Sequence, residues 1–348
     1  MNKLLPGFLK WRYELYLAEK IDLYGSLGFY LKSKYKRAAL MKHAQVVYLY
    51  ANKRNVGDYI SFLGIKEVIG KDGPELFCSP VWEKSLSRQL EFLKQNNPNC
   101  TLIIGGGGLL QPVFASFWEL ILTSGLRFAV VGVGVNLMKG RELFPSSFIG
   151  RLIEDAIFFS VRDTLTLSHI PEHLKTRVQL HLCPSVNYVN PRYGHNTRVN
   201  SNTLLHMKHP SDLRLSGINE EALSTLLREM ASERGLEYEE HTNMCANHEF
   251  MLRKVSGANV VVSSRLHGCI MAYACGIPFL PIFCDEKIAA FNNTHSGVEG
   301  IMPSQVTNKS TFSELLTSTV ENFTIQDEQL RMKIKENAEI GRKLQRLI

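Results

Sequence analysis

Short apolar runs alternate along the chain with longer segments whose apolar positions recur at helical spacing. Runs such as AQVVYLY, TLIIGGGG and FAVVGVGV are short and rich in Val, Ile or Gly, so they predict buried strands. Segments such as NEEALSTLLREMASERG lie between runs of this kind and predict amphipathic helices. Strands that alternate with helices are typical of a parallel sheet covered by helices. The pattern therefore predicts an α/β protein.

The alternation divides the chain into two halves. We expect a first Rossmann-like domain over 44–190 and a second over 200–325, joined by a polar, turn-rich linker at 187–201. A final helix in 326–348 is a candidate for packing back on the first domain. Two such domains facing a cleft would bind ligands at the carboxyl ends of their strands.

Composition excludes several classes of protein. The 348 residues are 45% hydrophobic and 21% charged, which is ordinary for a soluble globular protein and unlike a disordered or fibrous one. No stretch approaches the roughly 20 apolar residues of a membrane span, and the N-terminus lacks the pattern of a signal peptide. We therefore expect a cytoplasmic protein.

The seven cysteines form no CxxC pair and leave an odd count. This pattern argues against a disulfide framework and against a zinc site. We interpret the cysteines as small core residues. No metal and no cofactor is expected.

The net charge of +7 is concentrated near the N-terminus, where residues 1–54 hold eleven Lys or Arg against three Asp or Glu. The segment 1–43 also carries one Trp and five Tyr residues, and basic clusters with aromatics suit an anionic membrane surface. It predicts a peripheral contact with the inner membrane face, with a solvated helical appendage as the alternative. Nucleic acid is disfavoured because no nucleic-acid-binding motif is recognisable.

The stretch SSRLHGC places Arg265 and His267 where a strand ends and a helix begins. Backbone N–H groups and the helix dipole attract anions at such a point, and the arginine fork matches phosphate or carboxylate. The alternative is that Arg265 pairs with a structural acid and His267 caps the helix. Lys287 follows the next strand and is expected at the same sheet edge, although DEK is also an ordinary helix start.

The first half offers further candidates at its own strand ends. Arg162 and Asp163 follow the strand IFFSV, and Asp163 is also a natural helix N-cap. Gly106 and Gly107 belong to a glycine run after TLII, where bare backbone can approach a ligand. The run completes neither a Walker motif nor GxGxxG.

The stretch NVGD lies at the first strand-to-helix turn. Gly57 permits a tight turn there, while Asn55 and Asp58 can bind hydroxyls or cap the helix. The four letters carry little information alone, and their position at the expected ligand-binding edge is what makes them candidates.

In this order, NVGD, the glycine run, SVRD, RLHG and DEK resemble the polysaccharide pyruvyl transferase family over residues 44–290. The resemblance implies two Rossmann-like domains arranged as in GT-B glycosyltransferases. It also implies phosphoenolpyruvate as the donor and a pyruvate ketal on a sugar of a capsule, exopolysaccharide or cell-wall polymer as the product. By the same resemblance, Arg162, Arg265, Leu266, His267 and Lys287 bind the donor.

Ketal formation needs an acid for the methylene carbon and a base for the sugar hydroxyls. His267 is the candidate acid, with phosphate binding as an imidazolium as the alternative. Asp58 or Asp163 is the candidate base. Many relatives carry Asp-Pro-Ala where this chain has Cys183, Pro184 and Ser185, which leaves the acceptor side open.

Three functions remain compatible with the sequence. The first is a pyruvyl transferase acting on a lipid-linked or nucleotide-linked sugar, and the basic segment 1–43 fits a lipid-linked acceptor. The second is a GT-B glycosyltransferase that uses a nucleotide sugar. The third is a non-catalytic binding member of the fold.

Overall fold

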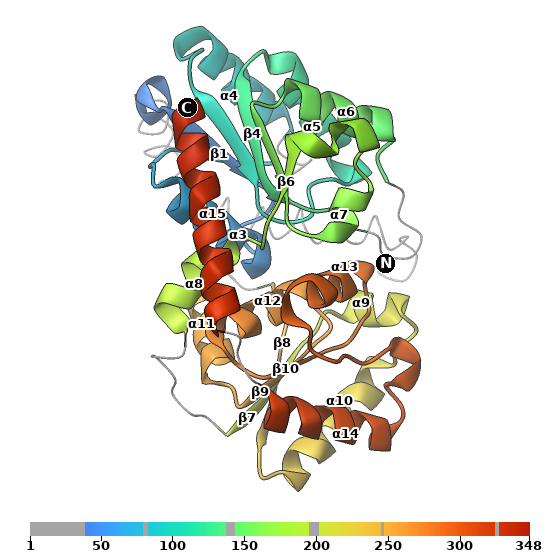
Figure 1. Cartoon of the computed structure of the whole chain (residues 1–348). Coiled ribbons are helices and arrows are strands. Elements are labelled where there is room, and N and C mark those ends of the chain that lie inside the picture. The colour runs from blue at the N-terminus through green and yellow to red at the C-terminus, as the bar shows by residue number, and fades with distance from the viewer. Residues whose placement is uncertain (1–38, 79–82, 137–142, 195–201, 245–246, 324–326) are drawn as a thin grey trace, which may run out of the picture.

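Two parallel sheets organise the chain, one in each half (Figure 1). The structure is a computed structural model that describes residues 39–78, 83–136, 143–194, 202–244, 247–323 and 327–348. Residues 1–38, which carry most of the predicted membrane-contact segment, and Cys245 lie outside the described residues. The two expected α/β halves are both present.

The first sheet has six parallel strands in the order β2-β1-β3-β4-β5-β6. Alternate side chains of the strand Val46–Tyr50 face opposite layers: Tyr48 packs with the helices on one side, and Leu49 packs with those on the other. The strands are β1 Val46–Tyr50, β2 Glu75–Phe77, β3 Thr101–Gly105, β4 Arg127–Val133, β5 Phe158–Val161 and β6 Val178–Leu180. Apart from β2, they correspond to apolar runs in the sequence.

Helices cover both faces of this sheet. One face is covered by α3 (Val56–Ile69) together with the C-terminal helix α15 (Asp327–Leu347), and the other by α4 (Glu83–Asn96), α5 (Ala115–Ser124) and α6 (Ser146–Asp155). Trp118 of α5 is fully buried, and its indole N–H donates to the Leu109 carbonyl over 2.9 Å. The short α7 (Thr164–Ser168) follows β5.

The second sheet has four parallel strands in the order β10-β9-β7-β8. They are β7 Thr203–Met207, β8 Glu237–His241, β9 Val260–Ser263 and β10 Phe279–Pro281. Leu204 of β7 faces one hydrophobic cluster and Leu205 faces another, so this sheet is also covered on both sides. Its helices are α9 Pro210–Leu215, α10 Glu220–Glu233, α11 His248–Gly257, α12 Leu266–Cys275, α13 Glu286–Phe291 and α14 Lys309–Asn322.

The junction between the halves contains a helix where the sequence suggested a linker. The helix α8 covers Ser185–Tyr193 and packs against both α3 and α12. It forms although it contains Pro191, because Val186 and Val189 are buried between the halves. Burial therefore outweighs the turn-rich composition that placed the linker at 187–201.

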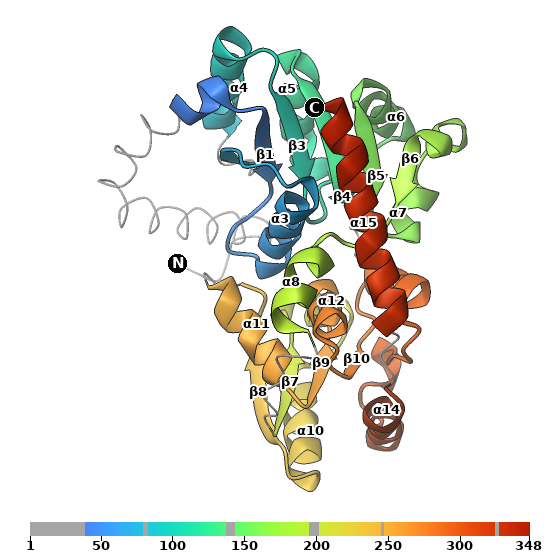
Figure 2. The same cartoon turned by 60° about the vertical axis from the view of Figure 1, so that its left-hand side comes forward.

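The C-terminal helix α15 crosses from the second half to the first, as Figure 2 shows. Asn337 of α15 is buried and donates to the Leu182 carbonyl (3.1 Å) and to the Asn187 side chain (2.7 Å) at the junction. Further along, Gly341 lies so close to α3 that a Cβ there would be 2.7 Å from the Val68 carbonyl carbon. The predicted packing of the last helix on the first domain is confirmed.

The cysteines behave as the sequence suggested. Of the six that the structure describes, five are buried and Cys284 is partly buried. Among the described residues, no helix is both long enough and apolar enough to traverse a bilayer.

Candidate functional site

The loops that follow the strands of both sheets meet at the junction between the halves. In Figure 1, α12 and α13 of the second half lie next to α3 and α7 of the first. The start of α3 is also held from the other half, because the Val56 amide donates to the Asn243 carbonyl over 2.8 Å. The carboxyl edges of the two sheets therefore face the same region, as the predicted ligand site requires.

The first turn of α3 approaches the first turn of α12. Asn55 caps α3 by accepting from the Gly57 amide over 3.1 Å. A Cβ at position 57 would lie 2.7 Å from the Cβ of His267 and closer still to its Nδ1, so the imidazole packs directly on the glycine. Glycine is required at position 57 by this contact.

The glycine run after β3 serves the same turn. Gly106 and Gly107 both have positive φ angles, 79° and 92°, which glycine adopts without strain. A Cβ on Gly107 would lie 2.8 Å from Cγ of Asp58. The run therefore lets the backbone lie directly against the Asp58 carboxyl group.

His267 is buried and contacts two side chains that the sequence analysis did not assign to the site. Its Nε2 lies 3.1 Å from Ser61 Oγ, in the second turn of α3, and 4.0 Å from Cys183 Sγ. Cys183, which stands in the sequence CPS, is buried beside Ser61 at 3.3 Å. Ser61 follows Gly57 by four residues, which puts it on the same face of α3; that spacing was the available signal.

Arg162 and Asp163 follow β5 and are both buried. Arg162 Nε lies 3.4 Å from an Asp163 carboxylate oxygen. The other Asp163 oxygen accepts from the amide (2.7 Å) and the hydroxyl (2.6 Å) of Thr166, so Asp163 is the N-cap of α7. Asp163 therefore orients Arg162 and starts a helix.

Arg265 and Lys287 reach the junction from the second half. Arg265 pairs with Asp212 of α9, a residue that the sequence did not single out. Lys287 Nζ lies 2.7 Å from Asp285 and donates across the junction to the Asn136 side chain over 3.2 Å. Each cation is thus held by a carboxylate of its own half.

Three cations influence the pKa values of the two titratable groups at the centre of the site, Asp58 and His267. Burial raises the pKa of Asp58 to about 6, and Arg162, Arg265 and Lys287 partly oppose that rise. Burial, with these same three cations, lowers the pKa of His267 well below the usual range. Near neutral pH the imidazole is therefore uncharged. The pKa of Asp58, at about 6, lies close enough to neutral pH for its carboxyl group to gain or lose a proton there.

The site has a positive character that suits an anion with more than one charge. The N-terminal ends of α3 and α12, 14 and 10 residues long, lie against each other through Gly57 and His267, and helix N-termini carry partial positive charge. Burial lowers the pKa of Lys287, and the nearby Asp285 partly opposes that effect. The charges of Arg265 and Arg162 also lower the pKa of Lys287. A polyanion bound there would raise that pKa again, because an opposite charge favours the charged form of the lysine.

Leu266, the remaining predicted donor-binding residue, begins α12 with its side chain buried in the core. Any contact of Leu266 with a ligand would involve its backbone. Within the described part of the chain, no three His, Cys, Asp or Glu side chains group in a way that could hold a metal ion.

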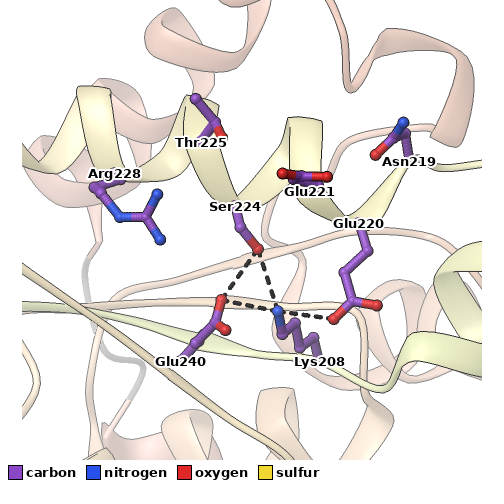
Figure 3. Close-up of a pocket in the computed structure, with 8 residues that line it drawn as sticks. All are labelled: Lys208, Asn219, Glu220, Glu221, Ser224, Thr225, Arg228 and Glu240. Carbon is purple, nitrogen blue, oxygen red and sulfur yellow. Dashed lines mark hydrogen bonds and ion pairs between the residues drawn. The ribbon is translucent and has the colours of Figure 1, made fainter.

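A second polar cluster lines an open hollow of about 520 Å³ between α10 and the ends of β7 and β8 (Figure 3). Lys208 lies at its centre and contacts Glu240 (2.8 Å), Glu220 (2.9 Å) and Ser224 (3.2 Å). Burial alone would raise the pKa of Glu240, but hydrogen bonds from Lys208, Tyr238 and Ser224 lower it to about 2. Lys208 is thus fully engaged in joining α10 to the two strands.

A family model described as polysaccharide pyruvyl transferase matches residues 55–285, more than half of the chain. The chain belongs to the polysaccharide pyruvyl transferase family. It is thus a member of a transferase family, and the modification of polysaccharides implies a sugar acceptor. The match includes the predicted site residues except Lys287, which lies two residues beyond its end.

Several solved structures are similar in fold to this family member. UDP-GlcNAc 2-epimerase from Neisseria meningitidis bound to UDP-GlcNAc is 8% identical with a TM-score of 0.53, over 85% of this chain and 97% of that one. S. aureus MnaA in its UDP co-structure is 9% identical with a TM-score of 0.54, over 81% and 92%. The chain therefore has the GT-B-like α/β fold that the sequence predicted. The comparison with curated proteins found no match.

Proposed function

We propose that this protein transfers the pyruvyl group of phosphoenolpyruvate onto two hydroxyls of a sugar, forming a pyruvate ketal and releasing phosphate. The observation that carries the proposal concerns three cations that come from both halves. The charges of Arg162, Arg265 and Lys287 all lower the pKa of Asp58 and the pKa of His267. The family match supports the same class of reaction.

The charges of the donor suit this arrangement. Phosphoenolpyruvate has a carboxylate and a phosphate on a three-carbon frame and carries close to three negative charges. The planar forks of Arg162 and Arg265 suit carboxylate and phosphate oxygens, and Lys287 is a point charge.

The proton balance of the reaction assigns a task to Asp58 and another to His267. Two acceptor hydroxyls each lose a hydrogen; one proton goes to the methylene carbon, and the other leaves with phosphate as the C2–O bond to phosphate breaks. The raised pKa of Asp58 suits the acid that protonates the methylene carbon, and the uncharged imidazole of His267 suits the base that accepts a hydroxyl proton. This reverses the assignment suggested by the sequence, in which His267 was the acid.

Asp163 has a different part in the proposal. Both its carboxylate oxygens are engaged, one by Thr166 and the other by Arg162. It therefore acts as a positioning residue for Arg162, which leaves Asp58, of the two carboxylates that the sequence analysis named, as the candidate group for proton transfer. The acceptor that we propose is a lipid-linked or nucleotide-linked sugar of a capsule, exopolysaccharide or cell-wall polymer precursor.

The donor assignment is tested by measuring the melting temperature with millimolar phosphoenolpyruvate, inorganic phosphate or UDP. A ligand that binds only the native state raises its stability. We expect phosphoenolpyruvate to give the largest rise and Arg265→Ala to abolish it. Arg228→Ala is the matched control, because Arg228 is an exposed arginine of the same half that lines the hollow around Lys208. The rise in melting temperature of this variant should equal that of the wild type.

A rise with UDP alone would contradict the proposal and favour a glycosyltransferase that uses a nucleotide sugar. No rise with any of the three ligands would contradict it in favour of a non-catalytic member. Because Arg265→Ala leaves Asp212 without its partner, the quantity to compare is the increment caused by the ligand, and not the melting temperature of the variant itself.

A further inference from the structure

Ser61 is a fully buried serine in α3 to which the proposed mechanism gives no task. Its Oγ contacts the Gly57 carbonyl at 2.7 Å, His267 Nε2 at 3.1 Å and Cys183 Sγ at 3.3 Å. A hydroxyl has one hydrogen to donate and two lone pairs that accept. Which of the three contacts receives that hydrogen decides which nitrogen of His267 carries a proton.

The hydrogens of this cluster can all be assigned in one consistent way. The Ser61 hydroxyl donates to the Gly57 carbonyl, its shortest contact. The Ser185 hydroxyl donates to Cys183 Sγ over 3.2 Å, which leaves the Cys183 S–H to point at Ser61 Oγ. The second lone pair of Ser61 then accepts from His267, which requires a hydrogen on Nε2.

We infer that Ser61 is a positioning residue that holds His267 in the tautomer with its hydrogen on Nε2, so that Nδ1 is the nitrogen that exchanges protons. Nδ1 lies against Gly57, in the same turn as Asp58. Among the described residues it has no hydrogen-bond partner, whereas the contacts of the ring with Ser61 and Cys183 are both through Nε2. A fixed tautomer presents the same nitrogen in every catalytic cycle.

The surroundings of the ring agree with an Nε2 that is held by Ser61 and an Nδ1 that exchanges protons. The nearest side chains at Nε2 are the hydroxyl of Ser61 and the thiol of Cys183. The charged groups that act on the ring come from other elements: Arg162 after β5, Arg265 before α12 and Lys287 on α13. Asp58 on α3 is the titratable acid acted on by those cations.

The role of Nδ1 as the base rests on the proposed function, but the tautomer itself does not. It can be measured on the wild-type protein with ¹⁵N-labelled histidine, using long-range ¹H–¹⁵N NMR correlation at pH 7.5, where the His267 signal is identified by its loss in His267→Asn. We expect a neutral imidazole protonated at Nε2. A His267 protonated at Nδ1 would overturn the inference at once.

Variants at position 61 then test whether the serine is the cause. Ser61→Ala should give a mixture of tautomers and lower kcat about tenfold, while the midpoint for phosphoenolpyruvate changes by less than about twofold. Ser61→Thr keeps the hydroxyl and should restore both the tautomer and most of kcat. An unchanged tautomer in Ser61→Ala would overturn the inference.

Ser160 provides a matched control, because it is also buried and its Oγ lies 2.9 Å from Nε2 of His181. Ser160→Ala should alter the His181 signal and leave the His267 tautomer as in the wild type. If Nε2 of His267 is protonated but phosphoenolpyruvate does not bind, the proposed function fails while the tautomer assignment stands; the reverse pattern is equally distinguishable.

Discussion

The two halves approach closely in the site because residue 57 is a glycine and has no side chain to separate them. His267 packs on the Cα of Gly57, and the space that a methyl group would need is already filled by the imidazole. The contact fixes the ring from one side while Ser61 holds Nε2 from the other. At this scale the site depends on the smallest side chain as much as on the charged ones.

Replacing Gly57 by alanine should therefore disturb the site more than the fold. We expect Gly57→Ala to displace the imidazole and to lower kcat/KM by at least about tenfold, with a loss of roughly 1–3 kcal/mol in the free energy of unfolding from overpacking. Steady-state kinetics and urea unfolding measure the two effects.

The control for this change is another helical glycine. A Cβ on Gly150 of α6 would meet only Leu174, at an ordinary 3.5 Å, so Gly150→Ala should keep full activity and gain up to about 1 kcal/mol of stability. Equal activities of the two variants would show that the imidazole can move without cost and would contradict the packing argument.

Among the pairs of elements that connect the halves are two that share α3. One is formed by α3 and α12, whose first turns meet at the site, and α8 packs against both of them. The other is formed by α15 and α3, where Gly341 approaches the backbone of Val68. Because α3 takes part in both pairs, a shift of α15 would be transmitted to the turn that carries Gly57 and Asp58.

The close approach of α15 can be tested by adding one methyl group. Gly341→Ala would have to separate α15 from α3, since the two nearest atoms in its way belong to the backbone of Val68 and cannot rotate aside. We expect the free energy of unfolding to fall by about 1–3 kcal/mol, measured as a lower urea midpoint.

The matched change in the same helix is Lys335→Ala, at an exposed position of α15, which should stay within about 0.5 kcal/mol of the wild type. If Gly341→Ala were as stable as Lys335→Ala, the contact between α15 and α3 would be looser than the structure has it.

At the scale of the whole molecule, burial of histidines makes stability depend on pH. Burial lowers the pKa of His181 and of His295 to about 4 and that of His206 to about 3. Below the ordinary histidine pKa of about 6.5 the unfolded chain takes up protons that the folded protein does not. Stability is therefore lost as the pH falls from about 7 towards 4.

Each of these histidines should cost about 2 kcal/mol between pH 7 and pH 5. Urea unfolding of the wild type at the two pH values measures the total loss. In His206→Phe the difference between the two pH values should be smaller by about that amount, because His206 is fully buried and has the lowest of these pKa values. An equal difference in the variant would mean that His206 is protonated in the folded protein.

The elements of the fold follow from local patterns, and their physical cause is visible in the chain. A buried parallel strand needs a short apolar run, and a helix on its face needs apolar positions at helical spacing, so β3, β4 and α10 can be identified from the letters alone. The exceptions have short or contrary patterns: β2 has three residues, and α8 forms in a stretch with the composition of a turn because both halves bury it.

The amino-acid sequence is enough to predict an α/β chain with two halves and cationic side chains after its strands, because the end of an apolar run marks the edge of a sheet. The positions of Arg162, Arg265 and Lys287 after their strands could be predicted for that reason. Which groups meet in the site depends on how the elements pack. The spacing of Ser61 from Gly57 places it only on the same face of a helix, and Asp212 lies in an ordinary helix start, PSD. Both belong to the site because packing brings α3 against α12 and α9 against the loop after β9.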